Sequence, residues 1–278
     1  MDEATAFAPG HVTAFFSTHQ DPDPTKAGSR GGGVTLSDGV HVTVSRDGTR
    51  DPGLQLDGEP VVMNSVTRVL ESLRVTDAHI NATTTLPLGA GFGVSGATAL
   101  GTALAAGQVY ERSLSENELV TIAHGAEVQA GTGLGDVVAQ ARGGMPLRLQ
   151  PGAPPYGRLD GIAAGPRQVE YLVLGQLSTE EILSGDTDEL SAAGERAISV
   201  VGGEPTVSRF MQSARRFARE AGLLTDEVRA VITDVSAADG DATMAMLGET
   251  VFALGTGLSD AGYDPASCMV DQAGAILE

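Results

Sequence analysis

Four glycines lie close together just before a run of alanines and leucines that favours a helix: Gly89, Gly91, Gly93 and Gly96. Glycine loses more backbone entropy on folding than any other residue, so such a group needs a reason. One reason is a phosphate chain that approaches bare backbone amides at the start of a helix, where unpaired N–H groups and the helix dipole favour an anion. The alternative is a tight strand-to-helix turn that binds nothing.

This glycine loop fits neither of the two commonest nucleotide signatures. A Walker loop ends in Gly-Lys-Ser/Thr, whereas this chain has Val94-Ser95-Gly96. A Rossmann fingerprint requires an acidic residue about 20 positions further on, at the end of a strand. Glu111 lies near that distance, but it follows the predicted helix. The residues therefore predict phosphate binding outside these two folds.

Three oxygen-bearing side chains could serve phosphoryl transfer: Ser95, Glu127 and Asp136. Mg²⁺ prefers hard oxygen ligands and often takes only one or two carboxylates. Each residue also has a structural interpretation. Ser95 could be a helix N-cap, Glu127 a solvated acid on a helix, and Asp136 a turn-forming residue in a second glycine-rich segment, 131–136. Spacing alone leaves both interpretations open.

The charge of the chain is strongly acidic. Its 278 residues hold 17 Lys plus Arg against 36 Asp plus Glu, a net charge of −19, and Lys26 is the only lysine. We interpret this as a surface adapted to high salt, where the Debye length falls to about 3 Å at 1 M and self-repulsion is screened. Without a basic patch to neutralise phosphates, nucleic-acid binding is excluded.

Cysteine content and hydropathy exclude several kinds of site and of protein. Cys268 is the only cysteine, which excludes a disulfide framework and a cysteine metal site within one chain. The histidines show no metal-ligand spacing, so we expect no zinc. No apolar run reaches the roughly 18 residues of a membrane span, and the acidic N-terminus lacks the features of a signal peptide. We therefore expect a cytoplasmic protein that binds no membrane.

Hydrophobic periodicity predicts mixed strands and helices in the first half of the chain. Asp38-Gly39 between two apolar runs predicts a hairpin. Ser115 and Glu118 have the spacing of a capping box that opens a helix. The other predicted elements are a strand at 12–16, a helix at 62–73, a strand at 78–84 and a helix at 95–110.

The Pro-Gly-Ala-Pro-Pro segment at 151–155 breaks regular structure. We place a domain boundary there, between residues 1–155 and 156–278. Beyond it, the run 169–174 predicts a buried strand, and a strand follows Gly248. An apolar stripe over 207–221 predicts a helix, which we interpret as core packing.

Three segments, taken in order, resemble the GHMP kinase superfamily, whose members phosphorylate small molecules with ATP. Residues 8–12 (Ala-Pro-Gly-His-Val) are similar to the family's N-terminal Pro-Gly motif, residues 87–97 to its phosphate loop, and residues 246–254 to its C-terminal glycine motif. Within the superfamily the chain most resembles the archaeal pantoate kinases, which make 4-phosphopantoate on the archaeal route to coenzyme A. The segments that carry this likeness are 29–31, 123–127, 131–137, 151–157 and 244–248.

This resemblance implies an α+β, two-domain GHMP-kinase-like fold. The N-terminal ATP-binding and catalytic domain (1–155) would be ribosomal-protein-S5-like, and the C-terminal GHMP-type domain (156–278) ferredoxin-like. It also implies ATP and Mg²⁺ as cofactors, pantoate as the small-molecule substrate, and a homodimer. The acidic, lysine-poor composition would suit a haloarchaeon. His11 stands where mevalonate kinases often carry Lys, and Val94 replaces the first Ser of a Ser-Ser pair, so mevalonate itself is disfavoured.

The resemblance also assigns roles to residues. Ser95 and Glu127 would hold the metal, and Asp136 would orient or deprotonate the attacking hydroxyl. The nucleotide site would comprise Pro87, Gly89, Gly91, Gly93, Ser95 and Gly96, and the substrate site Ser29, His124, Arg148 and Thr179. Arg148 is the expected carboxylate clamp. His124 lies three residues before Glu127, hence on the same helical face.

Several alternatives stay open on the sequence. Without the family, His124 would be a structural histidine and Thr179 a helix cap. The substrate could be that of another GHMP kinase, of the homoserine, shikimate or mevalonate type. A catalytically silent GHMP-fold protein that binds a metabolite and a dinucleotide-binding domain are the remaining possibilities.

Overall fold

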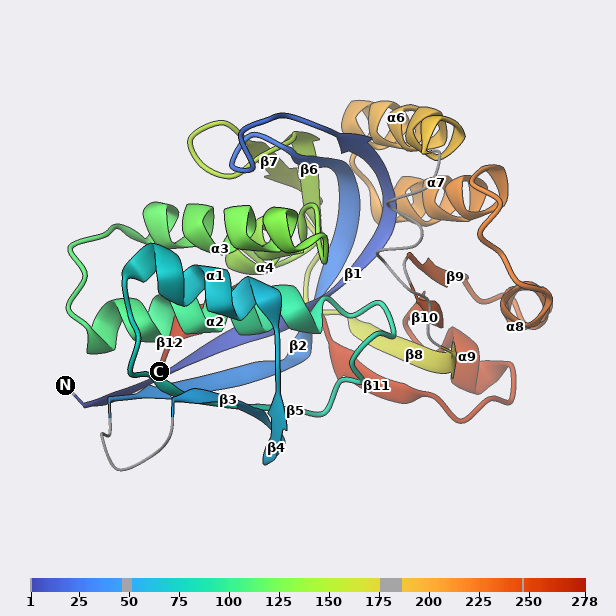
Figure 1. The fold of residues 1–278 in the computed structure, drawn as a ribbon. Coiled ribbons are helices and arrows are strands. Elements are labelled where there is room, and N and C mark those ends of the chain that lie inside the picture. The colour runs from blue at the N-terminus through green and yellow to red at the C-terminus, as the bar shows by residue number, and fades with distance from the viewer. Residues whose placement is uncertain (1, 47–51, 176–186, 247) are drawn as a thin grey trace.

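The computed structural model describes residues 2–46, 52–175, 187–246 and 248–278 (Figure 1). Two long antiparallel strands, β1 (Glu3–His19) and β2 (Gly28–Ser45), run through the larger of two sheets. β1 is buried almost continuously from Pro9 to Phe16 rather than at alternate residues. The reason is that α2 (Val94–Val109), α6 (Asp188–Gly203) and α7 (Val207–Glu220) all pack against it.

The hairpin predicted at Asp38-Gly39 is wrong. β2 continues through both residues and pairs with β1, with Gly39 opposite Pro9 and a register shift between Pro9 and Gly10. A β-bulge, which adds residues to one strand, thus occupies the place expected for a turn. A Cβ at Gly39 would lie 2.3 Å from the carbonyl oxygen of Ala8, so this glycine permits close approach of the two backbones.

The remaining strands of the large sheet flank this pair in the order β12-β1-β2-β5-β3-β4, and β6, paired with β7, adds to the other end of β2. These strands are β3 (Gly53–Leu56), β4 (Glu59–Val61), β5 (His79–Thr84), β6 (Pro146–Gln150), β7 (Arg158–Gly161) and β12 (Ile276–Leu277). Helices α1 (Asn64–Leu73), α2, α3 (Glu116–Ala130) and α4 (Asp136–Arg142) gather on one side of this sheet (Figure 1).

Helix α2 packs against β1 and β2 on one side and contacts both α1 and α3. All its residues except Ser95 and Gln108 are buried, as expected of a helix that is apolar on every side. Its many small residues allow the close approach: a Cβ at Gly101 would lie 2.6 Å from Val42. The sheet therefore fixes α2, and with it the glycine loop at its N-terminus.

The second sheet is antiparallel and has the order β11-β8-β10-β9. Its strands are β8 (Gln168–Gly175), β9 (Ala242–Ala245), β10 (Glu249–Leu254) and β11 (Ala266–Met269), and α8 (Asp226–Ala237) and α9 (Gly257–Asp260) accompany them. The stripe predicted on α7 is core packing: Phe210 and Phe217 are buried and meet Phe15 and Phe16 of β1 at ring distances of 5.4 and 5.9 Å.

The mixture of helices and sheets is the predicted α+β class. The capping box is confirmed: Ser115 accepts from the Glu118 amide, and the Glu118 carboxylate accepts from the Ser115 amide. The division of the chain after residue 155 stays a prediction. Among the described residues, no helix combines the length and apolar character needed to cross a bilayer.

Candidate active site

The glycine loop between β5 and α2 adopts the conformation for which glycine is suited. Gly89, Gly91 and Gly93 have φ angles of 79°, 87° and 64°, in the left-handed region. Gly93 is the N-cap of α2, and no side chain caps this helix, so the N-cap interpretation of Ser95 is wrong. The first-turn amides of α2 have no intrahelical acceptor. In the described part of the chain no other group accepts from them, which leaves them free for an anion.

Segments from both ends of the chain support this loop from behind. The backbone amide of His11 donates to the Phe92 carbonyl at 2.9 Å, and Thr250 Oγ1 donates to the Ala90 carbonyl at 2.8 Å. A Cβ at Gly248 would lie 2.2 Å from that same Ala90 oxygen. The three motifs singled out in the sequence therefore converge at one place.

Glu127, on α3, lies beneath the N-terminus of α2. Its side chain is 2% exposed, so the solvated-acid interpretation is wrong. Ser95 Oγ donates to Glu127 Oε2 at 3.2 Å, while Oε1 is buried with no hydrogen-bond partner in the described structure. Burial raises the pKa of Glu127 to about 7. The hydroxyl of Ser65 lies nearby and favours the ionised carboxylate, but it makes no well-aligned hydrogen bond and offsets only part of this rise.

This environment fits a divalent cation. A cation would supply the missing partner of Glu127 Oε1 and would favour the ionised carboxylate. No group of three or more His, Cys, Asp or Glu side chains suited to a metal occurs among the residues described. Ser95 and Glu127 could thus contribute only part of a coordination shell, as is usual for Mg²⁺ bound together with phosphates.

Asp136 is the first residue of α4, and its side chain is one-fifth exposed (21%). Its Oδ1 accepts a hydrogen bond of 2.7 Å from Nδ1 of His11, which is fully buried. Burial alone would raise the pKa of Asp136, but the His11 hydrogen bond and the charge of Arg148 outweigh it, so the pKa is lowered and the group stays ionised. The bond to His11 distinguishes Asp136 from an ordinary turn residue.

Sequence reasoning missed His11 as a member of this site. The available signal was its place in the Ala-Pro-Gly motif, where it was noted only as a departure from mevalonate kinases. Burial lowers the pKa of His11, so the imidazole is neutral. A neutral imidazole facing a carboxylate must carry its proton on Nδ1.

Arg148, on β6, is 2% exposed and lies beside Asp136. Its Nε donates to Ser29 Oγ at 3.2 Å, and Ser29 Oγ donates to the Leu134 carbonyl at 3.2 Å. Its Nη1 is buried and has no partner among the described residues. A Cβ at Gly135 would lie 2.6 Å from both Arg148 Nε and Ser29 Oγ, so only glycine leaves them room here.

Both carboxylates face one small region. A Cβ at Gly133 would lie 2.6 Å from Glu127 Oε2 and 3.4 Å from Asp136 Oδ2. A Cβ at Gly93 would lie 3.3 Å from the Asp136 side chain. The start of α2, Glu127 and Asp136 therefore surround a common space, with the Arg148 guanidinium next to it.

The other predicted site residues have different surroundings. His124 is buried on α3, and its Nε2 is bonded to the Ala27 carbonyl at 2.9 Å, as a structural histidine would be. Pro87 is half-buried and Gly89 is exposed at the outer part of the loop. Thr179 lies outside the described residues, so its predicted role stays a prediction.

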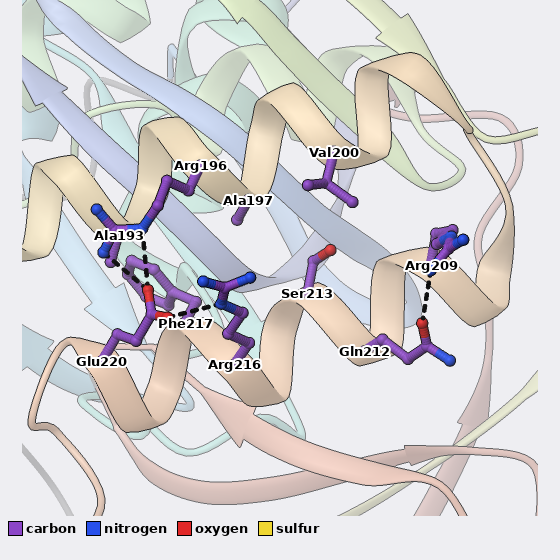
Figure 2. Close-up of a pocket in the computed structure, with 10 residues that line it drawn as sticks. All are labelled: Ala193, Arg196, Ala197, Val200, Arg209, Gln212, Ser213, Arg216, Phe217 and Glu220. Carbon is purple, nitrogen blue, oxygen red and sulfur yellow. Dashed lines mark hydrogen bonds and ion pairs between the residues drawn. The ribbon is translucent and has the colours of Figure 1, made fainter.

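A separate hollow lies between α6 and α7, with a cavity of about 140 Å³ (Figure 2). It contains none of the predicted site residues. Arg196 and Arg216 line it, and both donate to the one carboxylate of Glu220, at 2.8 and 2.6 Å. The residues that line this hollow include neither the glycine loop nor a buried carboxylate.

Comparisons of the sequence and of the structure with known proteins all lead to the same family. Residues 61–144 match the family described as GHMP kinases N terminal domain. The chain is 36% identical to the pantoate kinase of Thermococcus kodakarensis, over 90% of this chain and 86% of that protein, and 33% identical to that of Methanospirillum hungatei, over 92% and 88%. A solved structure described as a phosphotransferase related to CoA biosynthesis pathway superposes with a TM-score of 0.89 at 31% identity, covering 99% of this chain and 98% of the other. The chain therefore belongs to the pantoate kinase family, within the GHMP kinases.

Proposed function

We propose that this protein is a phosphotransferase that uses ATP and Mg²⁺ to phosphorylate pantoate at its 4-hydroxyl, giving 4-phosphopantoate. The observation that supports it best is Arg148, a buried guanidinium with an unpartnered Nη1 next to the ionised Asp136. A buried N–H donor without a partner is costly, and a carboxylate is the partner that a guanidinium binds best. Pantoate has both a carboxylate and a hydroxyl.

The glycine loop would hold the nucleotide. ATP is the donor that GHMP kinases use, and the free amides at the start of α2 would receive its phosphates. Pro87, Gly89, Gly91, Gly93 and Gly96 would shape this cradle. Ser95 and Glu127 would hold Mg²⁺, which when bound neutralises charge on the transferring phosphoryl group.

Asp136 would act on the attacking oxygen. It accepts the hydrogen bond of the substrate hydroxyl and takes its proton as the new O–P bond forms and the bond to ADP breaks. Arg148 would hold the substrate carboxylate through its free Nη1, and Ser29, which accepts from Arg148 Nε, would fix the guanidinium in the substrate site. His124 and Thr179 are the other substrate contacts that we propose. Since an alcohol without a carboxylate would leave Arg148 unpaired, we expect strong selection against it.

The assay that tests the proposed substrate compares four alcohols, all of which carry a carboxylate, with Mg-ATP in concentrated KCl: pantoate, homoserine, shikimate and mevalonate. We expect substrate-dependent ADP release with pantoate. Asp136→Ala should abolish it while ATP still raises the melting temperature of the variant, because the loop is unchanged. Preference for another alcohol, no turnover by the wild type, or an unimpaired Asp136→Ala variant would contradict the proposal.

We also infer that the enzyme works in the cytoplasm of a halophilic archaeon, as a homodimer. The charge of −19 and the single lysine support the salt adaptation. Activity and melting temperature should rise from about 0.1 M to molar KCl as surface repulsion is screened. Light scattering in molar KCl tests the dimer, and a mass of one chain would contradict it.

A further inference from the structure

We propose that His11 is a positioning residue for this reaction: its neutral imidazole donates Nδ1–H to Oδ1 of Asp136 and leaves Oδ2 aimed at the substrate hydroxyl. Only the kinetic role of His11 rests on the proposed function. The hydrogen bond, the tautomer and the orientation of the carboxylate are properties of the free protein and can be measured without turnover.

His11 is held firmly where it meets Asp136. The residue is 0% exposed and belongs to the middle of β1. Its backbone amide binds the Phe92 carbonyl at 2.9 Å, and its Nδ1 lies 2.7 Å from Asp136 Oδ1. Thr13 Oγ1 is the other polar atom near Nδ1, at 3.5 Å, too far to compete. One residue therefore connects the glycine loop to the proposed base.

The two oxygens of Asp136 have different surroundings. Oδ1 is bonded to His11, whereas Oδ2 faces the space beside Gly133, where the Glu127 carboxylate also points. A carboxylate bound through one oxygen cannot rotate freely, so the lone pairs of Oδ2 stay directed at that space. This is where a hydroxyl must lie to reach a phosphate in the glycine loop.

The tautomer follows from the surroundings of the other ring nitrogen. Nε2 is buried without a partner in the part of the chain described, and a Cβ at Gly33 would lie only 2.1 Å from it. A proton on Nε2 would bury an unpaired N–H and set the Nδ1 lone pair against a carboxylate. A doubly protonated ring would place a second buried cation close to Arg148. The Nδ1–H form avoids both costs.

Nitrogen NMR of protein labelled at its 5 histidines tests the geometry directly. In the wild type at pH 7, without ligands, we expect one histidine protonated on Nδ1 and bare at Nε2, and its signals should vanish in His11→Asn. An imidazolium or an Nε2–H tautomer at His11 would overturn the proposal. This measurement does not depend on enzymatic activity.

Kinetics of two substitutions test the role. His11→Leu removes the donor, whereas His11→Asn puts an amide N–H close to the position of Nδ1. We expect Leu to lower kcat by about 10- to 100-fold, the effect of one charge-assisted hydrogen bond, with both KM values nearly constant, and Asn to recover most of the loss. Equal losses in the two variants, or a change confined to KM, would overturn it. If the wild type phosphorylates no alcohol tested, the proposed function fails, and the NMR result alone decides the tautomer and hydrogen bond.

Discussion

Replacing Glu127 by glutamine should remove a destabilisation of the free protein that grows as the pH rises, although it should destroy activity. The folded state raises the pKa of this carboxyl from 4.5 to about 7 because the side chain is buried. Above the unfolded value, the folded protein must either keep a proton that the unfolded chain has released or bury a charge. Glu127 therefore does not lower the free energy of unfolding at low pH. The destabilisation grows as the pH rises from about 4.5 and levels off above about 7.

The size of the effect follows from the same shift. One pKa unit corresponds to about 1.4 kcal/mol, so the wild type should lose about 2 to 3 kcal/mol relative to Glu127→Gln between pH 5 and pH 8. For a chain of this length, 1 kcal/mol changes Tm by about 2 °C, which predicts a relative change of about 4 to 6 °C.

The measurement is thermal or urea unfolding of both proteins at pH 5 and pH 8, without nucleotide or metal. Comparing the two pH values cancels any constant cost of the new amide. Glu116→Gln removes an exposed acid from the same helix and serves as control, with a stability difference that should not change in this range. If Glu127→Gln and the wild type lose stability in parallel as the pH rises, the carboxyl is not a strained buried acid and the inference fails.

Three further substitutions test other contacts. Arg148→Lys keeps the charge but loses the planar fork, so kcat/KM for pantoate should fall by roughly 100-fold with KM for ATP unchanged; an equal rise of both KM values would argue against a substrate clamp. Gly93→Ala forces a left-handed residue and brings a Cβ to 3.0 Å from Gln140 Nε2, so calorimetry should show ATP affinity reduced by about 10-fold, and unchanged affinity would remove the loop from the nucleotide site. Gly33→Ala should displace the imidazole of His11 and lower Tm, and a variant with wild-type Tm and kcat would show that the ring has room to move.

Local interactions made part of this structure predictable. The capping box of Ser115 and Glu118 involves residues three apart, and the helix that it opens was predicted from it. Apolar periodicity placed α1 within two residues of its ends, since burial of one face dictates that pattern. The run of alanines and leucines after the glycines placed α2 within one residue of its ends. The Asp-Gly pair at residues 38 and 39 led to the wrong prediction of a turn, because β2 forms a bulge there and stays paired with β1.

Contacts between distant segments could not be predicted in the same way. His11 and Asp136 are 125 positions apart, and nothing in the spacing of either announces the hydrogen bond between them. Their meeting depends on where β1 passes the start of α4. The free Nη1 of Arg148 cannot be predicted from the sequence either, because it results from burial on β6 without a hydrogen-bond acceptor at that nitrogen. The motifs were enough to propose which residues belong to the site, but the hydrogen bonds between these residues could be found only from the fold.

The contact of Gly248 with Ala90 limits how such enzymes can be recombined. Two peptide units from opposite halves of the chain fit so tightly that a single added methyl group would strike the Ala90 carbonyl. A chimera that exchanges the carboxy-terminal half between distant kinases would therefore need residues 246–250 kept with the host's own glycine loop. Recombined kinases in which residues 246–250 and the glycine loop come from different parents should be mostly inactive. Among natural relatives, a substitution at Gly248 should occur together with a change at Ala90.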